Sequence, residues 1–324
     1  VIMPESSRRF LNDYPYRHTQ PMPWKELFEL VSEPSTAEHD DFYYDIFYRD
    51  LQSSKLQRAV GSVIVRQAAM DRLGEHPIVV EEGCGPNILL KQQAIDSHYR
   101  ADLHYILVAP EDKKLPIKAA QWPVDLRLTR AVNKAVSTAP RIGRGIGVDI
   151  QHAGDTKNKE WARACAFYGG EYMDEDEVAD YEMMEMQNPD NVDFYQADIA
   201  NLDTEKMKKE LSFEKVGLVT IPTVLNQLHP NDRKKAISSA IELLEPDGLI
   251  AVQDFVRIHP RRKSDFKVIP RGPRTTGAYR LFVIDPRDSG EEIHHIATFD
   301  NGRCNRVQFQ PAIRRFGFGR LFSA

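Results

Sequence analysis

Short β-branched apolar runs alternate with segments of helical periodicity from residue 77 to about residue 255. This alternation is typical of βαβ units, in which parallel strands form one sheet and helices cover both of its faces. The chain therefore predicts an α/β fold with a doubly wound, mostly parallel sheet. The expected strands end just before Gly83 and at Asp149, Asp198, Ile221 and Asp254.

The segments on either side of this region differ from it in composition and in the spacing of their apolar residues. Residues 1–76 are polar with helical spacing, which predicts an N-terminal helical cap. Residues 256–277 are rich in Pro and Arg and are expected to form a loop. Residues 278–310 contain three short apolar runs separated by turn residues, which predicts antiparallel strands. We therefore expect two domains, a cap over 1–76 and an α/β domain over 77–324.

Charge and cysteine content exclude several classes of protein. The 324 residues include 43 Lys and Arg against 48 Asp and Glu, so no global basic field favours nucleic acid. Three widely spaced cysteines, Cys84, Cys165 and Cys304, fit neither a disulfide scaffold nor a clustered metal site, and we assign no metal. No apolar run reaches the roughly 18 residues of a membrane span, and no secretory apolar region opens the chain. We expect a cytoplasmic protein without membrane contact. The sequence does not decide between a monomer and a homodimer.

A glycine-containing turn joins the first expected strand to the helical segment that follows. In VVEEGCGPN, Gly83 and Gly85 let the backbone approach a ligand without a Cβ atom between them. Asn87 is one of the few residue types that tolerate a left-handed backbone, and Cys84 supplies a small side chain. The N-terminus of the following helix presents free N–H groups to the same place.

Acidic residues close several of the expected strands. Glu81 and Glu82 precede the glycine turn, and Asp149, Asp198 and Asp254 each end a later strand. In open α/β sheets ligands bind outside the carboxyl ends of the strands, so these carboxylates should converge. A carboxylate after the second strand suits ribose hydroxyls, and one after the third can accept from an exocyclic amine. The pattern predicts an adenosine site.

Together these motifs resemble those of class I S-adenosylmethionine-dependent methyltransferases. VVEEGCGPN looks like their first motif, GVDI like the second-strand motif, and FYQADIANL like the one after it. LVTIPTVLNQLHP and AISSAIELLEPDGLIAVQDFV resemble the block of the fourth strand, the next helix and the fifth strand. The resemblance covers roughly 77–256 and implies a Rossmann-like fold, S-adenosylmethionine as cofactor, and methyl transfer. The cofactor-binding residues that it implies are Glu81, Gly83, Cys84, Gly85, Asn87, Asp149, Asp198, Ile199, Ile221 and Pro222.

Two carboxylates compete for the ribose position. Asp149 follows Gly85 by 64 positions, whereas about 20 is usual, and Glu111 follows it by only 26. We favour Asp149 for its GVDI context, which makes 92–141 an insertion. A second insertion is expected over 151–190, where an acidic run is predicted to be a solvated surface.

Acceptor-side residues should follow the fourth and fifth strands. The predicted catalytic groups there are His229, His259 and Asp254, the histidines because their pKa suits a general base. The predicted substrate-binding residues, some of them on the helical cap, are Tyr43, Tyr44, Tyr48, Asn226 and Arg261. Residues 257–274 carry seven Lys or Arg against one Asp, which predicts either a solvated loop or a clamp for an anionic acceptor.

Three functional hypotheses follow. The first is methyl transfer to a small-molecule acceptor, an acidic one included, under a helical lid. The second is a nicotinamide-dependent oxidoreductase, which prefers glycine where this chain has Ile88. The third is a methyltransferase-like scaffold that binds a partner without catalysis, since a fold does not fix a function.

Overall fold

The structure is a computed structural model of the chain. It describes residues 58–74, 76–95, 106–111, 115, 121–151, 183–184, 186–269, 279–288, 292–300, 304 and 306–316. The described helices are α4 (Ala59–Leu73), α5 (Ile88–Ala94), α6 (Leu126–Ser137), α9 (Thr204–Leu211) and α10 (Pro230–Leu243), with 3-10 helices η4 (Ile199–Asn201) and η5 (Pro311–Phe316). The described strands are β1 (Ile78–Glu82), β2 (Leu107–Ala109), β3 (Arg144–Asp149), β4 (Val192–Gln196), β5 (Val216–Pro222), β6 (Leu244–Asp254), β7 (Val256–His259), β8 (Arg262–Val268), β9 (Tyr279–Ile284), β10 (Ile293–Phe299) and β11 (Arg306–Phe309).

Nine of these strands form one sheet in the order β2-β11-β10-β9-β6-β5-β1-β3-β4. Strands β4, β3, β1, β5 and β6 run parallel, whereas β9, β10 and β11 pair antiparallel. The parallel half has the doubly wound order, in which the direction of winding reverses between β1 and β5. The predicted Rossmann-like fold with antiparallel C-terminal strands is therefore confirmed.

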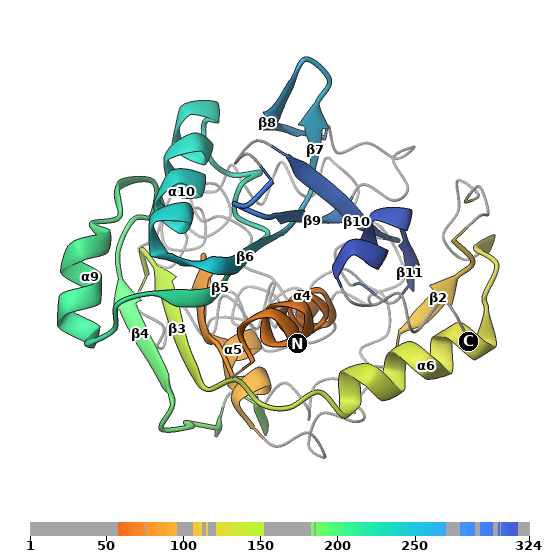
Figure 1. The fold of residues 1–324 in the computed structure, drawn as a ribbon, viewed down its shortest axis with the longest axis horizontal. Coiled ribbons are helices and arrows are strands. Elements are labelled where there is room, and N and C mark those ends of the chain that lie inside the picture. Colours follow the sequence, from red (N-terminus) through yellow and green to blue (C-terminus); the bar gives the residue numbers. More distant parts are fainter. Residues whose placement is uncertain are drawn as a thin grey trace, which may run out of the picture.

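Helices cover both faces of the parallel half (Figure 1). Val79 and Leu218 point into an apolar cluster with α4, α5 and α6, while Val80 and Val219 point into a second cluster with α9 and α10. Strands buried on both faces need apolar residues at successive positions, which is why these segments read as continuous apolar runs.

Helix α4 belongs to this layered structure. It packs on β5 and β6, and most of its residues are buried. The contact is close, because a Cβ atom on Gly61 would overlap the side-chain oxygen of Gln253. Residues 1–57 of the predicted helical cap lie outside the described part of the chain.

Part of the predicted insertion over 92–141 lies at the far edge of the sheet. After α5 the chain reaches β2, which pairs parallel with β11, and α6 packs against β2 before the chain returns to β3. The long sequence separation between Gly85 and Asp149 therefore corresponds to an excursion that leaves β1 and β3 adjacent.

One prediction about the flanks is wrong. Residues 256–268, expected to belong to a loop, form the antiparallel hairpin β7–β8, a separate two-stranded sheet. Its apolar side chains alternate with cations, and the buried Phe266 packs edge-on against Phe282 of β9. Proline and arginine content obscured this alternation in the sequence. Within the described residues, no helix has both the length and the apolar character needed to cross a membrane.

Candidate functional site

A crevice lies at the carboxyl ends of β1, β3, β4 and β5, where the winding of the sheet reverses. It encloses a cavity of about 190 Å³. Ligands in open α/β sheets bind at this position. The predicted cofactor-binding residues that line the crevice are Glu81, Gly83, Cys84, Gly85, Asp149, Asp198, Ile199 and Pro222.

The glycine turn between β1 and α5 forms the floor of this crevice. Gly83 and Gly85 have φ angles of 76° and 54°, and the Gly83 N–H donates to the Val148 carbonyl at 2.8 Å. A Cβ atom on Gly83 would lie 2.8 Å from Cβ of Val224. Asn87 has the predicted left-handed backbone, with φ 63°, but it supports the turn from behind, where its amide donates to the Asp193 carbonyl.

Asp149 is bonded directly to the glycine turn. Its Oδ2 accepts the Gly85 N–H at 2.8 Å and its Oδ1 accepts the Gln151 N–H at 3.1 Å. Burial raises the pKa of Asp149, and these backbone bonds counter part of that rise. The competing Glu111 follows β2 at the far end of the sheet and pairs with Arg314 at 2.8 Å. The sheet order thus places Asp149, and not Glu111, beside the turn.

Asp198 follows β4 and caps η4. Its Oδ1 accepts the Ala200 N–H at 2.9 Å, and its Oδ2 accepts from the Asn201 side chain at 2.6 Å. Two apolar side chains of the crevice lie next to the acids in sequence, Ile199 after Asp198 and Ile150 after Asp149. Ile150 is 61% exposed, so its side chain is accessible to a ligand in the crevice.

Glu81 is the most buried acid of the crevice, with 1% of its surface exposed. Its Oε2 accepts from the Thr220 hydroxyl at 3.3 Å, whereas its Oε1 is buried without a hydrogen-bond partner in the described part of the chain. Burial raises the pKa of Glu81 to about 8. Burial also raises the pKa of the Cys84 thiol, and the charges of Asp149 and Glu81 add to that effect. An unsatisfied buried carboxyl oxygen is expensive and suits a donor supplied by a ligand.

About half of the crevice wall consists of residues that the sequence motifs do not predict. These further lining residues are Arg58, Leu89, Ile150, Gln151, Ala197, Thr223, Val224, Gln227 and Leu228. Those that directly follow Asp149 or Pro222 could have been found by extending each strand end by a few positions. No motif in the sequence around Arg58 indicates a binding site. Arg58 lies at the crevice because α4 packs on the sheet.

Thr223 and Arg58 meet at one end of the crevice, around Tyr279. Thr223 has φ 59°, an uncommon conformation for a β-branched residue. It is held there because its N–H donates to the Gln253 carbonyl at 2.8 Å and its hydroxyl bonds the Tyr279 hydroxyl at 2.7 Å. The guanidinium of Arg58 lies 5.5 Å from the centre of the Tyr279 ring. Strained backbone of this kind often lies at binding sites.

The predicted acceptor-side residues do not gather in this crevice. Asp254 is fully buried and accepts from Asn226 and from the Phe255 N–H, so both residues fix the loop after β5. Burial raises the pKa of Asp254, and the Asn226 bonds counter part of this rise. Ile221 lies in the apolar core beneath the crevice.

The two predicted histidine bases also lie elsewhere. His229 caps α10 by accepting the Asn231 N–H, and its side chain is exposed. His259 accepts the Arg261 N–H at the tip of the β7–β8 hairpin. Tyr43, Tyr44 and Tyr48 lie outside the described residues.

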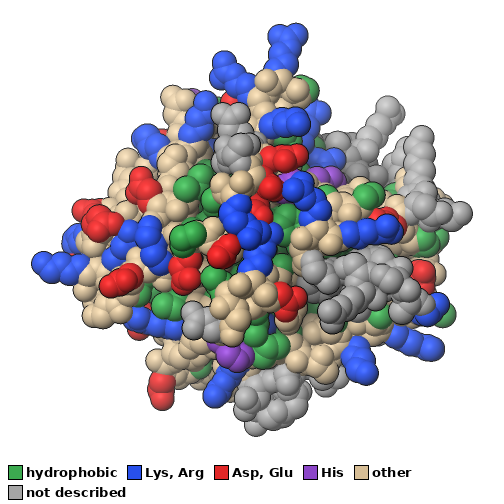
Figure 2. All heavy atoms as spheres, in the orientation of Figure 1, with side chains coloured by type: hydrophobic (Ala, Val, Ile, Leu, Met, Phe, Trp, Pro, Cys, Tyr) green, Lys and Arg blue, Asp and Glu red, His purple; other side chains and the backbone are tan. Residues whose placement is uncertain are grey.

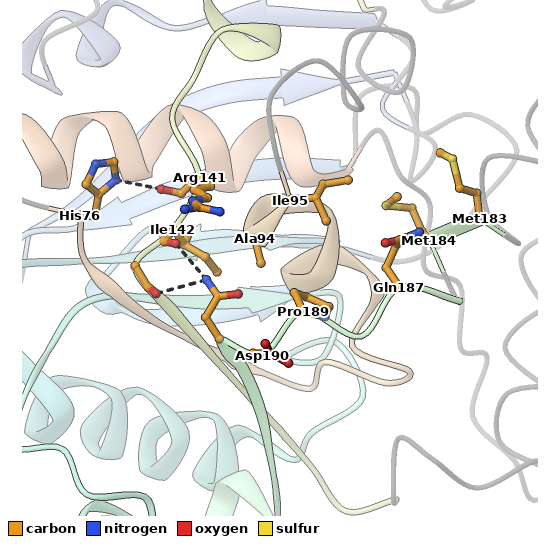
Figure 3. Close-up of a pocket in the computed structure, with 12 residues that line it drawn as sticks. His76, Ala94, Ile95, Arg141, Ile142, Met183, Met184, Gln187, Pro189 and Asp190 are labelled. Atoms are coloured by element: carbon orange, nitrogen blue, oxygen red, sulfur yellow. Dashed lines mark hydrogen bonds between the residues drawn. The ribbon is translucent and has the colours of Figure 1, made fainter.

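A larger cavity, of about 770 Å³, lies at the opposite edge of the sheet, before the starts of β1, β3 and β4. Figure 3 shows His76, Arg141 and Asp190 among the side chains around it, and the His76 ring bonds the Arg141 carbonyl at 2.9 Å. Separately, ligand atoms of Asp288, Glu292 and His294 lie within 4.8 Å of one another. Arg315 pairs with both acids of this trio and so offsets part of their negative charge.

No protein-family model and no curated protein matches the chain. Several solved structures do. The plantazolicin methyltransferase BamL, in complex with a triazolic desmethylPZN analog and SAH, is 12% identical over 69% of this chain and 53% of its own, with a TM-score of 0.31. An O-methyltransferase family protein from Burkholderia thailandensis is 12% identical over 79% of this chain and 54% of its own, with a TM-score of 0.32.

A third match is the glycopeptide N-methyltransferase MtfA in complex with (S)-adenosyl-L-homocysteine (SAH). It is 15% identical over 68% of this chain and 61% of its own, with a TM-score of 0.28. The chain thus spans between about half and three fifths of the length of these solved structures. Likeness at such low TM-scores supports no statement about activity.

Proposed function

We propose that the chain binds S-adenosylmethionine in the crevice and transfers its methyl group to an acceptor. The observation that carries this proposal is the convergence of Glu81, Asp149 and Asp198, from three adjacent strands, around the glycine turn of one cavity. The crevice fits the cofactor in two respects. The turn presents backbone where a Cβ atom would collide, and a buried Glu81 oxygen lacks a donor among the described residues.

Each acid suits a different part of the cofactor. Asp149 accepts one backbone N–H on each oxygen, which leaves lone pairs for the ribose hydroxyls. Asp198 would accept from the exocyclic amine of adenine, and Ile150 and Ile199, which line the same crevice, would be apolar neighbours of the ring. The cavity is below the range of about 300–1,000 Å³ that is typical for drug-sized ligands, so it encloses only part of the cofactor.

The methionine end of the cofactor carries both an ammonium and a carboxylate. Arg58 and Glu81 line the same crevice, and they offer the two complementary charges once Glu81 ionises. The ammonium would supply the donor that the Glu81 Oε1 lacks, and the guanidinium of Arg58 can bind a carboxylate. Glu81 was predicted from the sequence, whereas Arg58 is a second charged candidate that only the fold brings to the crevice.

Bound S-adenosylmethionine supplies an electrophilic methyl group on a sulfonium. The chain must orient this group toward the acceptor and keep the two in line. The Thr223–Leu228 loop forms the wall on the β5 side, where Asp254 and Asn226 hold its backbone. A small, anionic acceptor, a helical lid before residue 58, and proton acceptance by His229, His259 or Asp254 stay predictions.

Isothermal titration with S-adenosylmethionine, SAH and NAD tests this proposal. We expect the first two to bind and NAD not to bind, because Ile88, in place of a third glycine, is fully buried at the start of α5. Asp149→Ala should weaken binding of SAH by about 1.5–3 kcal/mol, the value of a hydrogen bond to a charged group. The control is Asp193→Ala. Asp193 lies on the outer strand β4, where it pairs with Arg144 of β3, and its removal should leave SAH affinity unchanged.

NAD binding would instead favour the oxidoreductase. If the protein binds SAH, loses affinity in Asp149→Ala, and yet methylates no acceptor in a broad screen, the result would favour the non-catalytic binding scaffold. Equal SAH affinity for Asp149→Ala and Asp193→Ala would contradict the proposed ribose contact.

A further inference from the structure

The β7–β8 hairpin is a basic part of the described surface. Five exposed cations lie on its two strands and turn, and Asp265 is its single acid. Asp265 is already paired, with Lys234 at 3.5 Å and Arg262 at 3.7 Å. The five cations are Arg257, Arg261, Arg262, Lys263 and Lys267. Figure 2 shows Lys and Arg side chains projecting at the top of the molecule, where Figure 1 places the hairpin.

Two of these cations face each other across the hairpin. Arg257 and Lys267 are direct partners in the β7–β8 register. Like charges at directly opposite positions destabilise an antiparallel pair. The charge of Arg257 also helps to lower the pKa of the adjacent Arg280, an effect to which burial contributes most. Within the described residues, no ion pair joins Arg257 or Lys267 to an acid.

Protection of an exposed strand edge requires charged residues but does not require two cations at directly opposed positions. An acid opposite Arg257 would protect the edge as well and would also stabilise the hairpin. The directly opposed Arg257 and Lys267 weaken it instead. A binding partner that neutralises them explains why this cost is tolerated.

The hairpin is fixed beside the crevice. Arg233 of α10 donates to the Leu225 carbonyl at 2.7 Å and to the Phe266 carbonyl at 3.3 Å. Leu225 belongs to the loop that forms the β5 side of the crevice, between the lining residues Val224 and Gln227. An anion on the hairpin would therefore lie next to the side of the crevice that the proposed acceptor must approach.

The spacing of the cations favours an extended anion. Lys263 and Lys267 alone are separated by about 13 Å along β8, at roughly 3.3 Å per strand residue, which is more than one phosphate can bridge. Single-stranded nucleic acid is disfavoured, because no aromatic side chain in the described part of the chain is exposed for base stacking.

We propose that the β7–β8 hairpin binds an acidic peptide segment and that this segment belongs to the acceptor. The first statement concerns the hairpin alone, and the second rests on the proposed methyl transfer. Carboxylates spaced along a peptide match both the number and the spread of the cations, and arginine forks bind carboxylates well.

The test is fluorescence anisotropy of the full chain with a labelled glutamate peptide of about ten residues, at low salt so that screening is weak. Lys267→Glu should weaken peptide binding about three- to thirtyfold, because it removes one exposed ion pair and adds a repulsion. The same variant should melt at the wild-type temperature or above it, because Arg257 then faces an acid. If Lys267 only supported the structure of the hairpin, the loss of peptide affinity would instead be accompanied by a lower melting temperature.

Arg127→Glu, at an exposed position on α6 away from the hairpin, makes the same change in net charge and should bind the peptide like the wild type. Equal peptide affinities for Lys267→Glu and Arg127→Glu would overturn the proposal. Tighter binding of a single-stranded oligonucleotide than of the peptide would overturn the class of partner. SAH titration of both variants keeps the two proposals separate, since failure of SAH to bind any form would count against the methyl-transfer proposal alone.

Discussion

Gly83→Ala is expected to weaken SAH binding about 10- to 100-fold while the protein stays folded. Gly83 has φ 76°, and an added Cβ atom would lie 2.8 Å from Cβ of Val224 on the opposite wall of the crevice. Relief of this overlap requires the Val224 loop or the turn to move, and overpacking of this kind costs about 1–3 kcal/mol. Both moving parts line the crevice, so most of the cost should appear in ligand binding.

Gly74→Ala is the matched control for this prediction. Gly74 ends α4 with φ 72°, close to that of Gly83, yet an added Cβ atom would meet no heavy atom within 4 Å. It should therefore show the backbone cost alone, about 1–2 kcal/mol of stability, with unchanged SAH affinity. Calorimetric melting and SAH titration of both variants measure the two effects. Similar SAH affinity for the two variants would show that the Gly83 turn is not close to the ligand.

The parts of the site that the sequence predicted are those with local causes. A glycine pair after an apolar strand must turn sharply, and acids that end neighbouring parallel strands must share one edge. Gly83, Gly85, Asp149 and Asp198 lie in the crevice for these reasons. The choice between Asp149 and Glu111 needed the strand order, because sequence separation alone favoured Glu111.

The parts that the sequence did not predict depend on packing between distant segments. Arg58 lines the crevice because α4 docks on β5 and β6, and no motif around Arg58 announces this contact. Thr223 adopts φ 59° because Tyr279, 56 residues later, bonds its hydroxyl. The position of an acid can also mislead, since Asp254 ends β6 as predicted but uses its oxygens to hold Asn226 and Phe255.

Glu81→Gln is expected to stabilise the free protein at neutral pH and at the same time to weaken SAH binding. Burial raises the pKa of Glu81 from 4.5 to about 8, so the unfolded chain releases this proton at a lower pH than the folded one. Between these two values the folded state binds more protons, and stability therefore falls as the pH rises from 4.5 to 8. The total effect is about 5 kcal/mol at most.

A glutamine at position 81 cannot ionise, so this loss of stability should disappear from the pH profile. Part of the profile will remain, because burial also raises the pKa of Glu82. Glu214→Gln, which removes an exposed acid, is the control and should leave the profile unchanged. Urea unfolding at several pH values between 5 and 8 gives the measurement. An unchanged slope for Glu81→Gln would mean that Glu81 is already ionised in the folded protein.

Ligand binding should respond to Glu81 in the opposite sense. An ammonium beside the Glu81 Oε1 stabilises the ionised carboxylate, so SAH affinity should increase as the pH rises toward 8 and binding at pH 7 should release a proton. Titration in two buffers of different protonation enthalpy detects that proton, and Glu81→Gln should abolish both the release and the pH dependence. Asp149 and Cys84 also line the crevice and have raised pKa values, so Asp149→Asn is the comparison. Proton release that survives in Glu81→Gln but not in Asp149→Asn would move the ammonium contact from Glu81 to Asp149.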